Sequence, residues 1–63
     1  MTSSEQTSRG KVLVVDDDAA LAEMLAIVLR NEGFDSRVVG HGDRALPEFR
    51  DYRPDVVLLD LML

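Results

Sequence analysis

The distribution of apolar positions predicts three strands and two helices. Lys11–Val15 and 56–59 are short, almost wholly apolar runs, typical of parallel strands covered on both faces. Residues 34–39 form a weaker strand of exposed character, which suits the edge of a sheet. Apolar residues recur at helical spacing over 19–30 and 44–52. Because the crossovers between strands are helical, we expect a β-α-β-α-β chain with parallel strands.

The first predicted helix has recognisable ends and an apolar stripe. Asp17 or Asp18 can cap its start, and Gly33 suits the left-handed position after its end. We expect its buried face to consist of Leu21, Leu25, Val28 and Leu29, with Met24 alongside.

The second predicted helix is less regular. Leu46, Phe49 and Tyr52 are expected to face inward. Proline is tolerated without cost only in the first turn of a helix. Pro47 therefore indicates that this helix either begins late or lacks one backbone hydrogen bond.

Composition narrows the class of protein. The chain has 63 residues, 46% apolar and 30% charged, which is a globular composition. Its net charge of −5 and its scattered basic residues argue against nucleic-acid binding. The absence of cysteine excludes disulfides and thiolate metal sites. No apolar run approaches the ~18 residues of a membrane-spanning helix, so we expect a soluble cytoplasmic protein with no membrane contact.

Size limits how much stability the chain can have alone. Below roughly 70–80 residues a single core seldom supplies more than a few kcal/mol. Residues 1–10 are polar after Met1 and are expected to form a disordered tail. The domain is therefore expected to span 11–63. Because it is so small, we expect it either to gain stability from a partner or to be part of a longer protein.

Carboxylates follow both apolar strands. Asp16, Asp17 and Asp18 come directly after the first, and Asp60 follows the third. If the first strand lies between the other two, Asp60 comes within reach of Asp16 and Asp17, and their repulsion calls for a cation. Mg²⁺ prefers such oxygen ligands, and a carboxylate beside it can accept a phosphoryl group. The alternative is that the triplet is a solvated helix cap and Asp60 begins a loop.

The segments 11–18, 33–34 and 54–63 together resemble a response-regulator receiver domain. The resemblance covers 11–63 and implies an incomplete doubly wound α/β fold, flavodoxin- or CheY-like, with parallel strands in the order 2-1-3. The first helix, from Asp18 to Phe34, resembles the actinobacterial MtrA branch of the OmpR/PhoB-type transcription regulators.

The resemblance also implies roles for individual residues. Asp60 would be the phosphoacceptor, receiving its phosphoryl group from the phosphohistidine of a sensor histidine kinase. Asp16 and Asp17 would hold Mg²⁺, together with Asp60 and the backbone carbonyl of Met62. Asp18 matches a position that such domains use as a helix cap. The domain would be a phosphoacceptor in two-component signalling and not an enzyme.

A complete receiver has five strands, whereas this sequence reaches only the third. We therefore expect a truncated receiver that is not competent alone. The full-length parent is expected to be a transcription regulator that binds DNA, although these residues would make no nucleic-acid contact. Strand 56–59 would be left as an exposed apolar edge and a site of self-association.

Two other readings stay open from the residues. Residues 12–18 also resemble the Asp-x-Asp motif of haloacid-dehalogenase-type phosphatases, with Asp16 as nucleophile and Asp18 as acid, although Ala20 departs from that family. The pattern Gly40-x-Gly42-x-x-Ala45, with Asp60 twenty residues after Gly40, matches a dinucleotide-binding fingerprint on paper. His41 has no partner at ligand spacing and is expected to be a surface residue.

Overall fold

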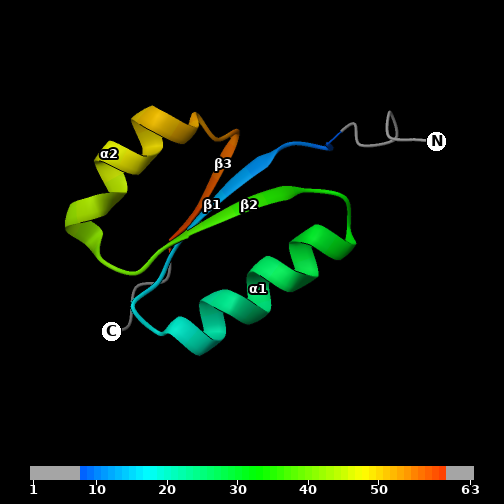
Figure 1. Cartoon of the computed structure of the whole chain (residues 1–63), viewed down its shortest axis with the longest axis horizontal. Helices are drawn as coiled ribbons and strands as arrows, with labels where there is room; N and C mark the ends of the chain where they lie inside the picture. Colours follow the sequence, from blue (N-terminus) through cyan, green and yellow to red (C-terminus); the bar gives the residue numbers. More distant parts are fainter. Residues whose placement is uncertain (1–7, 60–63) are drawn as a thin grey trace.

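Three parallel strands lie between two helices in the computed structural model, which describes residues 8–59 (Figure 1). The sheet order is β2-β1-β3, and both neighbouring pairs are parallel. The β-α-β-α-β architecture and the strand order 2-1-3 expected from the sequence are confirmed. The elements are β1 (Lys11–Val15), α1 (Ala19–Asn31), β2 (Asp35–Val39), α2 (Gly42–Tyr52) and β3 (Val56–Leu59).

The central strand β1 supplies the core on both faces of the sheet. Val12 and Val14 pack with Ala22 of α1, while Leu13 and Val15 pack on the opposite face, the side of α2. Side chains alternate between the faces of a strand, so this short apolar run serves two helices at once. All four of these β1 side chains are buried.

Helix α1 contacts the sheet through small side chains rather than through the whole predicted stripe. Ala22 and Ala26 are its buried residues, and Leu21, Leu25 and Leu29 are half-buried. The expectation that Val28 and Met24 belong to the buried face is wrong, because their exposed fractions are 52% and 56%. At about 100° per residue, Val28 lies roughly 120° around the helix from Ala22 and so misses the sheet.

The end of α1 is fixed by its glycine, as predicted. Gly33 has φ of 93°, and its N–H donates to the carbonyl of Arg30. The N–H of Phe34 donates to the carbonyl of Leu29, which completes a Schellman motif. Leu29 and Phe34 both pack against the α1 side of the core, so the turn is stapled by apolar contact.

Helix α2 differs from its predicted form. It begins at Gly42, two residues before the expected Arg44, and contains Pro47 beyond its first turn. Leu46 and Phe49, expected to face inward, have exposed fractions of 57% and 45%. They line an open groove beside β3, and neither helix packs over β3 within residues 8–59, so nothing there covers their outer side.

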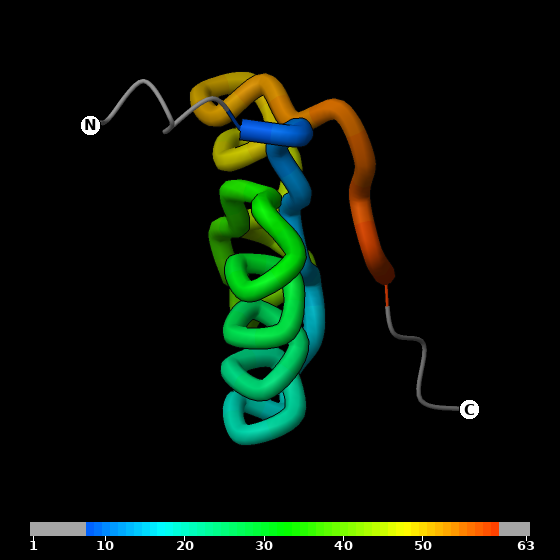
Figure 2. The backbone as a smooth tube through the Cα atoms, turned by 90° about the vertical axis from the view of Figure 1, so that its right-hand side faces the viewer, coloured from blue at the N-terminus to red at the C-terminus, as the bar shows by residue number. Residues whose placement is uncertain are grey.

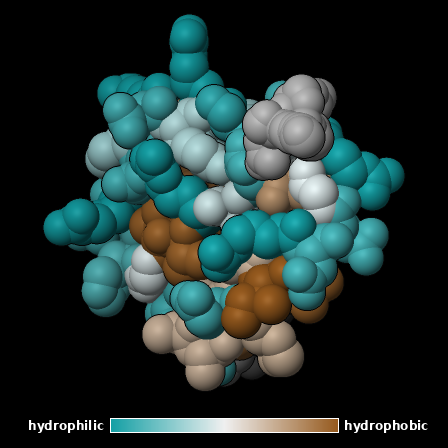
Figure 3. Space-filling view, turned by 45° about the vertical axis from the view of Figure 1, so that its right-hand side comes forward, coloured by the Kyte–Doolittle hydropathy of each residue, from teal (hydrophilic) through white to brown (hydrophobic). Residues whose placement is uncertain are grey.

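Strand β3 forms an open edge of the sheet. Figure 2 shows it standing to one side of the helices, which lie over β1 and β2. Its four residues, Val56–Leu59, are all apolar and all exposed. Figure 3 shows apolar patches between polar side chains on one face of the molecule. The sheet is thus covered well at its β2 side and poorly at its β3 side.

The last residues of the predicted tail, Arg9 and Gly10, contact the folded part of the chain. The N–H of Arg9 donates to the carbonyl of Gly33, and the N–H of Asp35 donates to the carbonyl of Gly10. Residues 1–7 of the expected tail lie outside the described residues, so that part of the expectation stays a prediction. Neither helix within residues 8–59 has the length and apolar character needed to cross a membrane.

We expect Gly33→Ala to lower the free energy of unfolding by about 1–2 kcal/mol, because an L side chain is strained at this left-handed φ. Gly42→Ala is the matched control, since Gly42 begins α2 without a positive φ and with open space around it. That control should leave stability unchanged or raise it. Urea unfolding followed by circular dichroism measures both, and equal effects would contradict the Schellman assignment.

Candidate functional site

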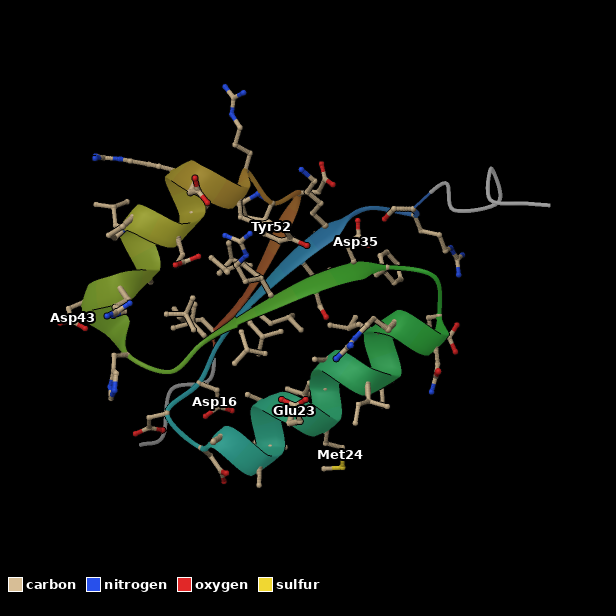
Figure 4. The ribbon with its side chains drawn as sticks, in the orientation of Figure 1. Asp16, Glu23, Met24, Asp35, Asp43 and Tyr52 are labelled. Atoms are coloured by element: carbon tan, nitrogen blue, oxygen red, sulfur yellow. The ribbon has the colours of Figure 1, made fainter. Side chains whose placement is uncertain are left out.

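The site is built on the turn between β1 and α1. Asp16, Asp17 and Asp18 occupy this turn at the carboxyl end of the central strand. Figure 4 places Asp16 there, beside the beginning of α1. Open α/β sheets bind ligands outside the carboxyl ends of their strands, so the turn occupies the expected position.

Asp16 is the most constrained residue of the turn. Its N–H donates to the carbonyl of Val39 at 3.1 Å, which extends the pairing with β2 past the end of β1. The side chain is buried, and its Oδ1 accepts from the N–H of Asp18 at 2.9 Å. Its Oδ2 is buried without a hydrogen-bond partner. A buried carboxylate oxygen with no donor is costly, which makes it a strong candidate for a cation ligand.

Asp17 and Asp18 have different surroundings. Asp17 is exposed at the rim of the sheet. The Oδ1 of Asp18 accepts from the N–H of Leu21 at 3.2 Å, so Asp18 is the N-cap of α1 as predicted. The consecutive carboxylates therefore divide into a buried one, an exposed one and a cap.

An apolar groove of about 380 Å³ runs from this turn between α1 and β3. It is open to solvent, and among the lining residues that the structure describes Asp16 is the only charged one. The lining residues are Val14, Val15, Asp16, Leu21, Leu25, Leu58 and Leu59.

The remaining predicted site residues, Asp60 and Met62, lie outside the described residues. Within 8–59, no group of three His, Cys, Asp or Glu side chains is placed to hold a metal ion. His41 is exposed, as expected, and precedes α2 without capping it through its side chain.

A second polar cluster, which sequence reasoning missed, joins β2 to α2. Arg37 Nη1 lies 2.9 Å from Glu48 Oε1 and 3.1 Å from Asp51 Oδ2. Hydrogen bonds to Glu48 and then Asp51 raise the pKa of Arg37, and burial raises the pKa of Tyr52, over whose ring Arg37 lies. Residues 48, 51 and 52 are three and four positions apart and so share one helix face, and this spacing was the sequence signal that could have predicted the cluster.

Comparison with known proteins identifies the family. Residues 12–63 match the family described as response regulator receiver domain. The chain belongs to this family. Receiver domains are phosphoaccepting signalling domains of two-component systems that interact with sensor histidine kinases, and they are not enzymes. Membership replaces both alternative readings, the phosphatase and the dinucleotide-binding module.

Curated proteins with similar sequences show which receiver-containing proteins this chain resembles. The DNA-binding response regulator MtrA of Mycobacterium tuberculosis strain H37Rv is 67% identical over 57 residues, which are 90% of this chain and 25% of that protein. MtrA of Mycolicibacterium smegmatis is 65% identical over 57 residues, again 90% of this chain and 25% of the relative. The sensory transduction protein RegX3 of Mycolicibacterium smegmatis is 56% identical over 52 residues, 82% of this chain and 23% of that protein.

The receiver resemblance is therefore confirmed, including its MtrA-like character. The chain spans about a quarter of the length of these curated relatives.

We expect Asp18→Ala to lower the free energy of unfolding by about 0.5–2 kcal/mol, because the first turn of α1 loses its side-chain acceptor. Asp18→Asn keeps an acceptor oxygen and should stay within about 0.5 kcal/mol of the parent chain. Urea unfolding measures both variants. An equal loss for Asn and Ala would show that the charge of Asp18, and not its cap, stabilises the turn.

Proposed function

We propose that this chain carries the phosphoacceptor site of a receiver, with Asp60 as the residue that accepts a phosphoryl group. The donor is the phosphohistidine of a sensor histidine kinase. Asp16 and Asp17 hold Mg²⁺, together with Asp60 and the backbone carbonyl of Met62. The reaction takes place in the cytoplasm, and the longer parent protein is a transcription regulator that binds DNA.

The observation that carries this proposal is the register between β1 and β3. Val15 and Leu59 are partners in the parallel ladder, and each is followed in the sequence by an aspartate. Parallel strands end at the same edge of a sheet, so Val15 and Leu59 lie at the same level, and in the sequence an aspartate is the next residue after each. The acid at the end of the central strand and the acid after β3 are thus suited to act on one phosphoryl group.

The residues present fit a hard divalent cation. Asp16 Oδ2 is buried and has no hydrogen-bond donor, while Oδ1 is already held by the N–H of Asp18. One oxygen is therefore oriented by the protein, and the other is left for a ligand. Mg²⁺ binds through one or two carboxylates and keeps waters that a phosphate can replace. When bound, it would neutralise charge that develops on the transferring phosphoryl group.

The 63 residues are not expected to be competent alone. The relatives are about four times as long as the matched region, and the groove between α1 and β3 is open beside Asp16. Transfer of a phosphoryl group depends on excluding water and on fixed positions for every charged group. These residues themselves make no nucleic-acid contact, in keeping with their net charge of −5.

The test is a chimera in which residues 11–63 are joined to the segment of Mycobacterium tuberculosis MtrA that follows the matched region. We expect incubation with acetyl phosphate and Mg²⁺ to add one phosphoryl group per chain, measured by intact mass. Asp60→Asn should abolish the addition, and Asp16→Asn should slow it by about tenfold or more because a cation ligand is lost.

Asp18→Asn is the matched control in the same turn, and it should be phosphorylated like the parent chimera. A phosphoryl group that persists in Asp60→Asn would overturn the assignment. Its location on Asp16 would instead place the phosphoacceptor at the end of β1.

We also propose that the isolated chain associates with itself through β3. The edge consists of four exposed apolar residues with no charged side chain among them, and such an edge is a template for another strand. A second copy of β3 would pair with it and cover the flanking grooves.

Sedimentation velocity over a range of concentrations tests this association. We expect Val56→Lys to weaken it by about tenfold or more, the change produced by roughly 1.4 kcal/mol. Met24→Lys is the control, since Met24 is equally exposed but lies on α1. A chain that stays monomeric throughout would refute the proposal.

A further inference from the structure

The two ends of α2 are attached to the sheet very differently. At the C-terminal end, Tyr52 packs against the core, and Arg37 lies 4.5 Å from its ring centroid. Lys11, on β1, contacts the same residue: its Nζ lies 5.3 Å from the Tyr52 ring centroid and donates to the Tyr52 carbonyl at 3.4 Å. Arg37 also binds Glu48 and Asp51, so several independent contacts hold this half.

The chain after α2 is fixed at the same end. The N–H of Lys11 donates to Asp55 Oδ2, and the N–H of Asp55 donates to the Lys11 carbonyl, both at 2.8 Å. These paired bonds tie the connection between α2 and β3 to the start of β1. The C-terminal half of α2 therefore has little freedom to move.

The N-terminal half has far weaker attachment. No residue of α2 is buried, and the methyl group of Ala45 is what this half packs against the core. His41 supplies no side-chain cap, and Gly40 and Gly42 have open space around their Cα atoms. Pro47 has no N–H, so the carbonyl of Asp43 lacks its helical donor at the boundary between the two halves.

We propose that α2 is a hinged flap: residues 42–46 lift away from the sheet while residues 48–52 stay clamped by Arg37 and Lys11. The bend falls at Pro47, where the helical ladder is already interrupted, and the glycine-flanked loop at 40–42 absorbs the movement.

The flap forms one side of an open groove of about 260 Å³ that is lined mainly by apolar residues. Leu46 and Phe49 form its outer wall, and Val57 and Leu59 of β3 form part of its floor. Lifting the first half of α2 moves Leu46 away and exposes Leu13 and Val15 of the core. The flap thus controls access to one face of the sheet, and this inference does not depend on the proposed phosphorylation.

Residue-resolved amide hydrogen exchange of the 63-residue chain, measured by NMR, tests the flap. The informative amides are Leu46 and Glu48, the fifth and seventh residues of α2. In an α-helix these N–H groups donate to the carbonyls four residues earlier, those of Gly42 and Arg44, which both belong to the lifting half, so the Glu48 amide reports on the flap although its side chain is clamped. Glu23 and Leu25 hold the same places in α1 and serve as internal controls for the ordinary fraying of a helix start. We expect the α2 pair to exchange at least about tenfold faster than the α1 pair and than Asp51 and Tyr52.

Two variants separate the flap from general instability. Pro47→Ala restores a donor for the Asp43 carbonyl and should slow exchange at Leu46 and Glu48 by about tenfold. The pair Glu48→Gln and Asp51→Asn removes the carboxylates that Arg37 binds, and it should speed exchange at Tyr52 towards the rate of Leu46. The matched control, Glu23→Gln with Asp43→Asn, changes the net charge equally and should leave Tyr52 unaffected.

Equal protection in both halves of α2, or uniformly fast exchange along the chain, would overturn the proposal. So would a Pro47→Ala chain whose Leu46 and Glu48 amides exchange at the original rate.

Discussion

Burial of β1 on both faces is the constraint on which the rest of the structure depends. Four consecutive apolar side chains point alternately to the two sides of the sheet, and each pair needs a cover. Helix α1 covers one side and α2 the other, and this need accounts for the central place of the strand. Because β1 is central, the turn that follows it lies between both neighbouring strands, where a ligand can be reached from each.

The two helices pack against the sheet to different extents. Helix α1 approaches closely, because its contacts are made by Ala22 and Ala26, and half-buried leucines flank them. Helix α2 contributes no buried residue and depends on Arg37 and Tyr52 at one end. The three-stranded sheet thus has one face covered by buried residues of α1, one face covered by a helix without buried residues, and an open edge at β3.

The sequence predicted the strands and the acidic turn because each rests on local patterns, whereas the strand order was implied by the resemblance to receiver domains. Two apolar runs define β1 and β3, and Gly33 and Asp18 mark the ends of α1. Periodicity could not say which apolar residues of a helix would be covered, since that depends on neighbouring elements. Val28, Met24, Leu46 and Phe49 were therefore misplaced.

The same limit applies to the site. The acidic triplet itself was predicted from the sequence, as was the cap formed by Asp18. The burial of Asp16 was not, because it depends on the carbonyl of Val39 and on the first turn of α1. The bonds of Arg37 to Glu48 and Asp51 require the placement of α2 over β2, which no local pattern contains.

One chain of hydrogen bonds gives the acidic turn a mechanical property. The carbonyl of Val39 holds the backbone of Asp16, the N–H of Asp18 holds its Oδ1, and Asp18 in turn holds the N–H of Leu21. The carboxylate and the first turn of α1 therefore share a joint and cannot be displaced independently. A partner that binds α1 and shifts it would reorient the Asp16 carboxylate. By the reciprocity of linkage, a cation bound at that carboxylate would then change the affinity of α1 for the partner.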